Sequence, residues 1–271
     1  MDAFTEFERE GWERVAGNYD STWATSTRQF ISPLLDAVEV KAGMSMLDVG
    51  CGPGYVSAAA AERGATPIGL DFSGEMVGIA RRRLPAIEFR EGDAQSLPFD
   101  DGIFDRVVAN FALLHLAKPE RACAEACRVL KPGGRFGFTT WARVEENPFV
   151  KLVDDAIQAH ANLDVSLPPG PPYYLFESPE AFRSALVRAG FDADSMSFKV
   201  HRIEWEVPTA DFVFEAELNA GVRTAGLLAA QTPAALSAIR SAMSQGVRPY
   251  ARGGGFAIPK AAYVVAASKA K

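Results

Sequence analysis

The sequence predicts an α/β protein built on a doubly wound, Rossmann-like sheet. Five short apolar segments end near residues 49, 71, 92, 110 and 140, and a helical or helix-length segment separates each from the next. This alternation is typical of parallel strands whose connections cover both faces of one sheet. A glycine-rich turn follows the first segment directly, which places a candidate binding site at the end of that strand.

Residues 46–49, Met-Leu-Asp-Val, form the first predicted strand, and their apolar side chains suit a strand that is covered on both faces. Gly50, Gly52 and Gly54 follow it. Because glycine has no Cβ atom, a ligand can approach the backbone closely at these three points. Residues 55–63 then have helical composition. Strand, glycine turn and helix N-terminus together predict a nucleotide-type site.

The remaining elements of this half follow in order. They are predicted strands at 66–71, 87–92 and 104–110, a helix at 118–129, a turn at 130–134 and a strand at 135–140. The strands are short apolar runs bounded by glycine, proline or acidic residues, and the helix is long enough to cross back over the sheet.

Acidic side chains end three of these strands. Asp48 precedes the glycine turn, where a carboxylate suits a positively charged group. Asp71 follows Gly50 by 21 residues, the spacing at which dinucleotide folds place an acid on ribose hydroxyls. Asp93 would lie beside a base. Asp71 and Asp93 are also suited to cap the helices that follow, so that interpretation stays open.

Two strands and several helices are predicted in the C-terminal half. The helices are at 150–161, 179–189 and within 209–246, and the strands are at 197–207 and 256–267. Residues 197–207 alternate apolar and polar side chains, as a strand does. The two strands are separated by about 45 residues, far more than a hairpin loop needs. We therefore expect residues 209–255 to form a helical cap.

Five sequence motifs occur in the order seen in a known family. They are residues 47–54, 70–76, 92–99, 104–115 and 130–134. The pattern resembles the class I S-adenosylmethionine-dependent methyltransferases, and is similar to their small-molecule branch of ubiquinone and menaquinone methyltransferases. The resemblance is most specific over residues 40–142. It implies a seven-stranded sheet with an antiparallel last strand, S-adenosyl-L-methionine as cofactor and S-adenosyl-L-homocysteine as product.

The resemblance assigns one group of residues to the methionyl end of the cofactor. The backbone of Gly50, Gly52 and Gly54 would face this part. Asp48 would lie near its amino group, directly or through water, and the carbonyl of Ala109 would meet the ammonium group. Tyr19 belongs to an N-terminal segment that resembles the one folding over the methionyl end.

A second group is assigned to the adenosine. Asp71 would accept hydrogen bonds from both ribose hydroxyls. Phe72 and Met76 would flank the adenine ring. Asp93 would accept from the adenine amino group, and the Ala94 N–H would donate to the ring.

His115 is the candidate catalytic residue. Many relatives have two histidines after the fourth strand, whereas this chain has Leu114 followed by His115. A neutral imidazole there could take a proton from the methyl acceptor near neutral pH. A hydrogen-bonded structural histidine remains the alternative.

Three segments lie outside the predicted sheet: the N-terminal helices (1–40), a lid insertion (144–177) and the cap insertion (209–255). Residues 41–143 would form the cofactor-binding core, completed by 178–208 and 256–271. The three segments carry the aromatic residues Trp12, Tyr19, Trp23, Phe149, Tyr173, Tyr174, Phe176, Phe212 and Phe214. A cavity closed by such side chains suits an apolar or aromatic small molecule, with an oxygen, nitrogen or carbon atom as nucleophile.

Composition and charge restrict the partners. The chain has 271 residues, and its 28 Lys plus Arg against 34 Asp plus Glu give a net charge of −6. Nucleic acid is therefore an unsuitable substrate. An apolar signal region and an 18-residue apolar span are absent from the sequence, so we expect a cytoplasmic protein without a membrane span. Cys123 and Cys127 have no accompanying His/Cys cluster, so we expect packed thiols and no metal site.

Two other classes of function stay open. A nicotinamide-dependent oxidoreductase would share the glycine turn and Asp71, but it would give Asp48 and Asp93 no task. A lyase or binding protein that keeps the cofactor site without transferring methyl groups would differ only in the lid. The sequence contains no signal for the oligomeric state.

Overall fold

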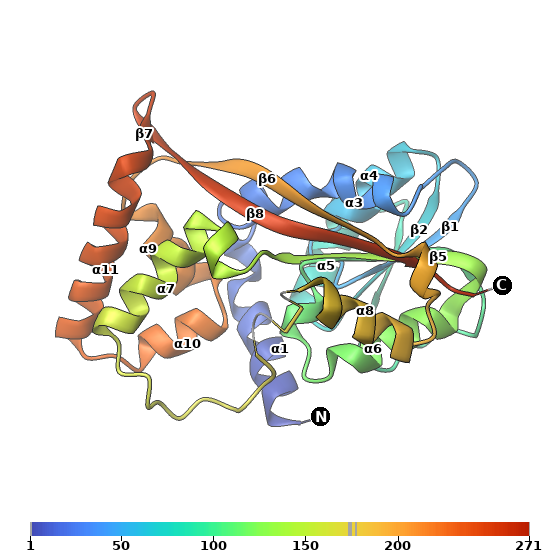
Figure 1. Ribbon diagram of the computed structural model, residues 1–271, viewed down its shortest axis with the longest axis horizontal. Helices are drawn as coiled ribbons and strands as arrows, with labels where there is room; N and C mark the ends of the chain where they lie inside the picture. Colours follow the sequence, from blue (N-terminus) through green and yellow to red (C-terminus); the bar gives the residue numbers. More distant parts are fainter. Residues whose placement is uncertain (1, 173–174, 177, 271) are drawn as a thin grey trace.

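A mixed sheet runs through the computed structural model, which describes residues 2–172, 175–176 and 178–270 (Figure 1). Its strands are β1 (Ser45–Val49), β2 (Thr66–Asp71), β3 (Glu88–Glu91), β4 (Phe104–Asn110), β5 (Leu130–Trp141), β6 (Ser197–Val207), β7 (Ala251–Arg252) and β8 (Gly255–Ser268). The order is β3-β2-β1-β4-β5-β8-β6, and the short β7 pairs with β8. Strands β1 to β5 are parallel, and β8 is antiparallel to both β5 and β6. The predicted sheet with an antiparallel last strand is confirmed, and β7 is additional.

The helices connect and cover these strands. They are α1 (Ala3–Val15), α2 (Ala24–Thr27), α3 (Ile31–Ala37), α4 (Tyr55–Glu62), α5 (Gly74–Arg83), α6 (Pro119–Val129), α7 (Pro148–His160), α8 (Pro179–Arg188), α9 (Phe212–Ala220), α10 (Arg223–Ala229) and α11 (Pro233–Val247). Several begin where a side chain accepts a hydrogen bond from the first turn, as Ser73, Asn147, Ser178 and Thr232 do. Proline follows the last three of these, at a position where its missing N–H costs nothing.

The predicted turn at 130–134 is wrong. Strand β5 already begins at Leu130, which pairs with Phe104 of β4. The register then shifts before Arg106, and Gly133 has a positive φ of 73°. The Pro-Gly-Gly sequence is therefore accommodated as an irregularity inside the strand, not as a turn between elements.

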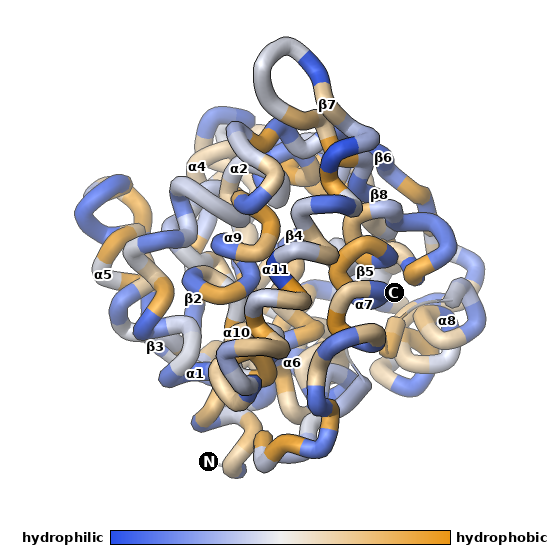
Figure 2. The backbone as a smooth tube through the Cα atoms, turned by 90° about the vertical axis from the view of Figure 1, so that its left-hand side faces the viewer, coloured by the Kyte–Doolittle hydropathy of each residue, from blue (hydrophilic) through white to orange (hydrophobic). Residues whose placement is uncertain are grey.

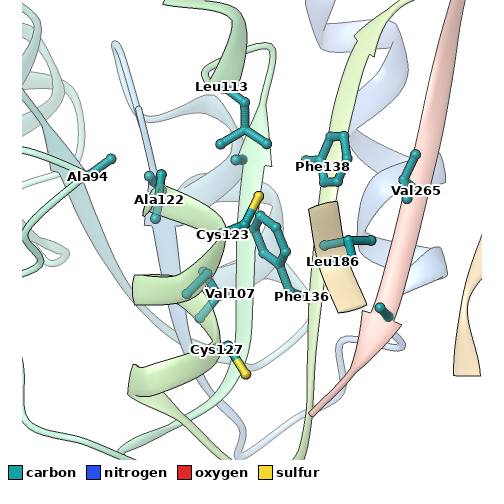
Figure 3. Packing of buried hydrophobic residues seen from close by; sticks show 14 of the residues in the cluster. Ala94, Val107, Leu113, Ala122, Cys123, Cys127, Phe136, Phe138, Leu186 and Val265 are labelled. Carbon is teal, nitrogen blue, oxygen red and sulfur yellow. The ribbon is translucent and has the colours of Figure 1, made fainter. Parts of the chain in front are cut away.

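The core between the sheet and helices α6 and α8 is a cluster of buried apolar side chains. Cys123 and Cys127 of α6 lie against the sheet beside Phe136 and Val107, and Leu186 of α8 closes the same layer (Figure 3). Both thiols are buried. The prediction that they pack α6 against the sheet is confirmed.

A second apolar cluster joins the insertion at 209–255 to the sheet. Helices α7, α9, α10 and α11 gather at one side of the molecule, where the long strands β6 and β8 extend beyond the other strands (Figure 1). Ile239 and Met243 of α11 are fully buried in this cluster with Trp205 of β6. The β7 turn projects from the same end at the top of Figure 2. The predicted helical cap (209–255) therefore packs around an apolar cluster of its own.

Two kinds of feature are not found in the part of the chain that the structure describes. No helix there is long and apolar enough to cross a membrane. No group of three or more His, Cys, Asp or Glu side chains in the same residues could hold a metal ion.

Candidate active site

A cavity of about 540 Å³ opens at the C-terminal ends of the parallel strands. Its floor includes Gly50 after β1, Asp71 at the end of β2 and Asn110 at the end of β4. Trp12 of α1 and Val153 of α7 are among the residues that close it from the other side. This edge is where open α/β sheets bind ligands, and a largely apolar lining is typical of small-molecule sites.

The glycine turn contributes two of its three glycines to the cavity. Gly50 and Gly52 line it with φ of 65° and 50°, a region that side-chain-bearing residues rarely adopt. A Cβ atom built on Gly52 would meet nothing within 4 Å, so the backbone is open to a ligand there. Gly54 is not among the lining residues. A Cβ on Gly54 would approach Leu84 and Phe89 to 2.9 and 3.0 Å, so this glycine serves packing.

Asp71 borders the cavity and organises the turn. The residue is 5% exposed. One oxygen accepts a hydrogen bond from the Gly52 N–H at 2.8 Å, and the other accepts from the Ser73 N–H at 2.9 Å. Burial raises the pKa of Asp71 to about 6, against the lowering by these backbone donors. Ser73, not Asp71, caps α5, so the capping interpretation of Asp71 is wrong.

Asp48 lies beneath the turn, outside the described cavity lining. It is fully buried, and its Oδ2 accepts a hydrogen bond from Ser57 Oγ at 2.7 Å. Its Oδ1 has no hydrogen-bond partner among the described residues. Desolvation raises the pKa of Asp48 to about 7. Of the two contacts predicted for Asp48, this position does not favour the direct one.

Of the four residues assigned to the adenine ring, three line the cavity and one does not. Phe72, Met76 and Ala94 line the cavity. Asp93 is half-buried and not among the described lining residues. It accepts hydrogen bonds from the backbone and side-chain nitrogens of Gln95, at 2.8 and 3.0 Å, and so closes a local turn. It caps no described helix, so that alternative is also wrong.

At the end of β4, the cavity is lined by the residues that follow Ala109 and not by Ala109 itself. Ala109 is fully buried within the strand, and Asn110 and Phe111 are the residues that line the cavity. Phe111 has a φ of 56°, unusual for an aromatic residue, and the strand ends abruptly there. Thr139 fixes this corner because its hydroxyl donates to Asn110 Oδ1 at 2.7 Å and accepts from the Phe111 N–H at 2.9 Å.

Tyr19 lines the cavity, as its place in the N-terminal segment predicts. Its hydroxyl is 3.0 Å from Thr27 Oγ1, and its ring meets Trp12 edge to face at 6.0 Å. Burial raises the pKa of Tyr19 to about 12, so the hydroxyl stays protonated. Tyr19 can therefore offer a hydrogen bond to a ligand but no charge.

His115 is held by a carboxylate that sequence reasoning missed. Glu8 of α1 is fully buried; its Oε2 lies 3.0 Å from His115 Nδ1, and its Oε1 lies 2.7 Å from Arg223 Nε. Burial alone would raise the pKa of Glu8, but attraction to His115 and Arg223 lowers it overall. One feature of the sequence could have indicated that Glu8 is buried. It lies four residues from Phe4 and from Trp12, on the apolar stripe of the helix.

The aromatic residues of segments 1–40, 144–177 and 209–255 fall into two groups. Trp12, Tyr19, Trp23 and Phe149 line the cavity. Phe176, Phe212 and Phe214 pack in the two apolar clusters instead and join the lid to the sheet. Tyr173 and Tyr174 lie outside the described residues.

A buried lysine supports the aromatic wall. Lys260 of β8 is 1% exposed. Its nitrogen lies 4.9 Å from the ring centre of Trp23, 4.2 Å from Trp141, 4.1 Å from Phe149 and 4.3 Å from Trp205. Desolvation lowers the pKa of Lys260 to about 7. Cation–π attraction thus ties together four rings, three of which face the cavity.

Known proteins share both this fold and its motifs. A family model described as a methyltransferase domain matches residues 47–138. A demethylmenaquinone methyltransferase of Clavibacter sepedonicus is 33% identical over 247 residues, which cover 84% of this chain and 90% of that protein. The chain belongs to the class I S-adenosylmethionine-dependent methyltransferases. The predicted family and enzyme class are confirmed.

Other relatives of this methyltransferase have different names. A nocamycin O-methyltransferase of Saccharothrix syringae is 37% identical over 136 residues, 47% of this chain and 49% of that protein. The solved structure of the cyclase SpnF has a TM-score of 0.55 at 23% identity, covering 92% of this chain and 84% of the other, which is a likeness of fold. Membership in the family therefore does not identify the methyl acceptor.

Proposed function

We propose that this methyltransferase binds S-adenosyl-L-methionine at the ends of β1 and β2 and transfers its methyl group to a small, apolar or aromatic acceptor. The observation that carries the proposal is the open space over Gly52 beside the buried carboxylate of Asp71. Each Asp71 oxygen accepts one backbone N–H and keeps a further lone pair. The carboxylate therefore still fits a pair of ribose hydroxyls.

The cavity wall supports an apolar acceptor. Its lid side contains Trp23 and Phe149 together with aliphatic residues of α7. We propose residues 1–40, 144–177 and 209–255 as the segments that cover the two ligands. A wall of this kind excludes water and holds the reacting groups in line, which is the main task in methyl transfer.

When bound, the cofactor supplies an electrophilic methyl group on a sulfonium. The contribution of this chain at the acceptor is the pair His115 and Glu8. The ionised Glu8 accepts a hydrogen bond from the Nδ1–H of His115 and so fixes the orientation of the imidazole. In this orientation His115 takes the proton that an oxygen or nitrogen acceptor loses on methylation.

A non-methylating activity is the second candidate, because SpnF carries this fold and is named a cyclase. The distinguishing experiment uses the purified protein with a pool of small aromatic and apolar metabolites. Formation of S-adenosyl-L-homocysteine with one of them supports methyl transfer. Binding of the cofactor without turnover on any pool supports the second candidate.

Cofactor identity is tested separately by thermal unfolding. S-adenosyl-L-homocysteine at 100 times its dissociation constant should stabilise the protein by about 2.7 kcal/mol. NAD⁺ at the same concentration should leave the melting temperature unchanged. The reverse result would contradict the proposal and favour an oxidoreductase.

A further inference from the structure

Two of the carboxylates that line the cavity are buried, and one of them has no assigned task. Asp71, 5% exposed, lies at the cofactor end. Glu217, 7% exposed, comes from α9 in the 209–255 insertion. A buried carboxyl group costs free energy unless a hydrogen bond or a charge compensates it. The position of Glu217 therefore calls for a partner.

The surroundings of Glu217 supply only part of that compensation. Its carboxyl group lies against the Gly221 backbone, because a Cβ built on Gly221 would be 3.3 Å from Glu217 Oε2. The side chain of Thr224 on α10 and the charge of Lys260 on β8 both lower the pKa of Glu217. The Lys260 nitrogen is itself hydrogen-bonded to Ser26 Oγ at 3.1 Å and enclosed by rings. Desolvation remains the largest influence and raises the pKa of Glu217 to about 7.

The neighbouring cavity wall is largely apolar, although Asp154, Arg223 and Thr224 also line it. Val222 and Leu227 from the same insertion line it, as do Val153 and Ile157 of α7. In such a wall a small number of polar groups orient the ligand and decide which ligands are accepted. Of the polar groups here, Arg223 already pairs with Glu8. A site built to hydrogen-bond one group rejects analogues that lack it, because its own polar atom is then left unpaired.

We propose that Glu217 binds a hydrogen-bond donor on the methyl acceptor, a hydroxyl or an amine, and that it thereby selects acceptors that carry one. The inference rests on the proposed methyl-transfer function, since it places the acceptor against α9. In this arrangement Glu217 determines which acceptors bind, and Asp71 binds the cofactor.

The test measures binding of three probes to the full-length protein saturated with S-adenosyl-L-homocysteine. The probes are 2-naphthol, 1-naphthylmethylamine and 2-methoxynaphthalene, which share an aromatic body and differ in the donor. We expect the wild type to bind at least one donor probe about 10- to 100-fold more tightly than the methoxy compound, as expected for a hydrogen bond to a charged group. Preference for the naphthol indicates a hydroxyl acceptor, and preference for the amine indicates an amine acceptor.

In Glu217→Gln the preference should fall to within about threefold, while binding of the methoxy compound stays unchanged. Glu215→Gln is the matched control, because Glu215 is an exposed glutamate of the same helix. Glu217→Asp, which keeps the charge but shortens the side chain, should lose part of the preference and replaces the first variant if that one unfolds.

The proposal is overturned if the wild type shows no preference or binds none of the probes, or if Glu217→Gln keeps the preference. Binding of S-adenosyl-L-homocysteine is measured first in each protein. Loss of that binding in the wild type would contradict the proposed function. Retained cofactor binding without probe discrimination would contradict the role of Glu217 alone.

Discussion

Asp71 has a double role, because it bridges Gly52 and Ser73 and also borders the cavity. Replacing it with alanine should weaken S-adenosyl-L-methionine binding by about 2–4 kcal/mol, through lost charge-assisted hydrogen bonds. Titration calorimetry measures the change. Asp93→Ala is the control: Asp93 closes only a local turn, so its loss should be clearly smaller. Equal losses for both variants would remove the special role of Asp71.

His115 is tested by its pH dependence. His115→Ala should slow turnover roughly ten- to a hundredfold, at the low end of general-base effects. The pH–rate profile of the wild type should contain a limb that this variant lacks. Glu8→Gln keeps the shape of Glu8 but removes its charge, so it should change that limb without abolishing turnover. Profiles of the same form in wild type and His115→Ala would leave the histidine a structural role.

At the scale of elements, α1 and α10 are fitted closely together. A Cβ on Gly11 of α1 would lie 2.4 Å from Val222, a buried, branched residue next to Arg223. Overpacking of this kind costs about 1–3 kcal/mol, whereas alanine gains only about 1 kcal/mol of helix propensity. Gly11→Ala should therefore lower the unfolding midpoint in urea.

Gly78 of α5 provides the matched control for Gly11. A Cβ there would meet only the end of the flexible Arg82 side chain, at 3.3 Å. Gly78→Ala should therefore keep the propensity gain and raise the midpoint. A midpoint that rises in both variants would show that α1 and α10 are less closely fitted than the structure describes.

The elements themselves were largely predictable, because their signals are local. The alternation over 197–207 matches β6, and the apolar run 104–110 matches β4. The contacts within the site were not predictable in the same way. Glu8 and Arg223 are 215 residues apart in sequence, and no local period brings them together.

The glycine turn shows the same limit within one motif. Three glycines at regular spacing predict a site, yet Gly52 faces open space while Gly54 packs on Phe89. The difference depends on where β3 and α5 lie, which the turn sequence does not contain. Asp48 is similar, since its burial follows from the helix above it and not from its place in the motif.

For the whole molecule, the buried titratable groups predict an unusual pH dependence of stability. Asp48, Asp71 and Glu217 have raised pKa values of about 7, 6 and 7. Between about pH 4 and 7 the folded state therefore binds more protons than the unfolded state, and stability falls as pH rises. Lys260 has a pKa lowered to about 7, so from about pH 7 to 9 the unfolded state binds more protons and stability rises again. Above about pH 9 the buried thiols of Cys51, Cys123 and Cys127, whose pKa values burial raises, oppose this rise.

The ligand-free protein should therefore have a minimum of stability near pH 7. His201, whose pKa burial lowers, opposes the fall just below pH 6.5. Urea unfolding at pH 5, 7 and 9 checks the curve. In the double variant Glu217→Gln and Lys260→Met the minimum should become shallower. A wild-type midpoint that peaks at pH 7 would contradict the assignment of these groups.

Val207 at the end of β6 pairs with Phe256 near the start of β8, so the segment between them is inserted at one point of the sheet. The chain leaves the sheet and returns to it at adjacent positions of one antiparallel ladder, so the ends of the intervening segment are already held together. A segment of different length can therefore replace it where it keeps the contacts that Val222 and Arg223 make with α1. Under the proposed function, gene duplication followed by replacement of this one segment would change the acceptor and keep the cofactor site, and chimaeras between relatives would be joined at Val207 and Phe256.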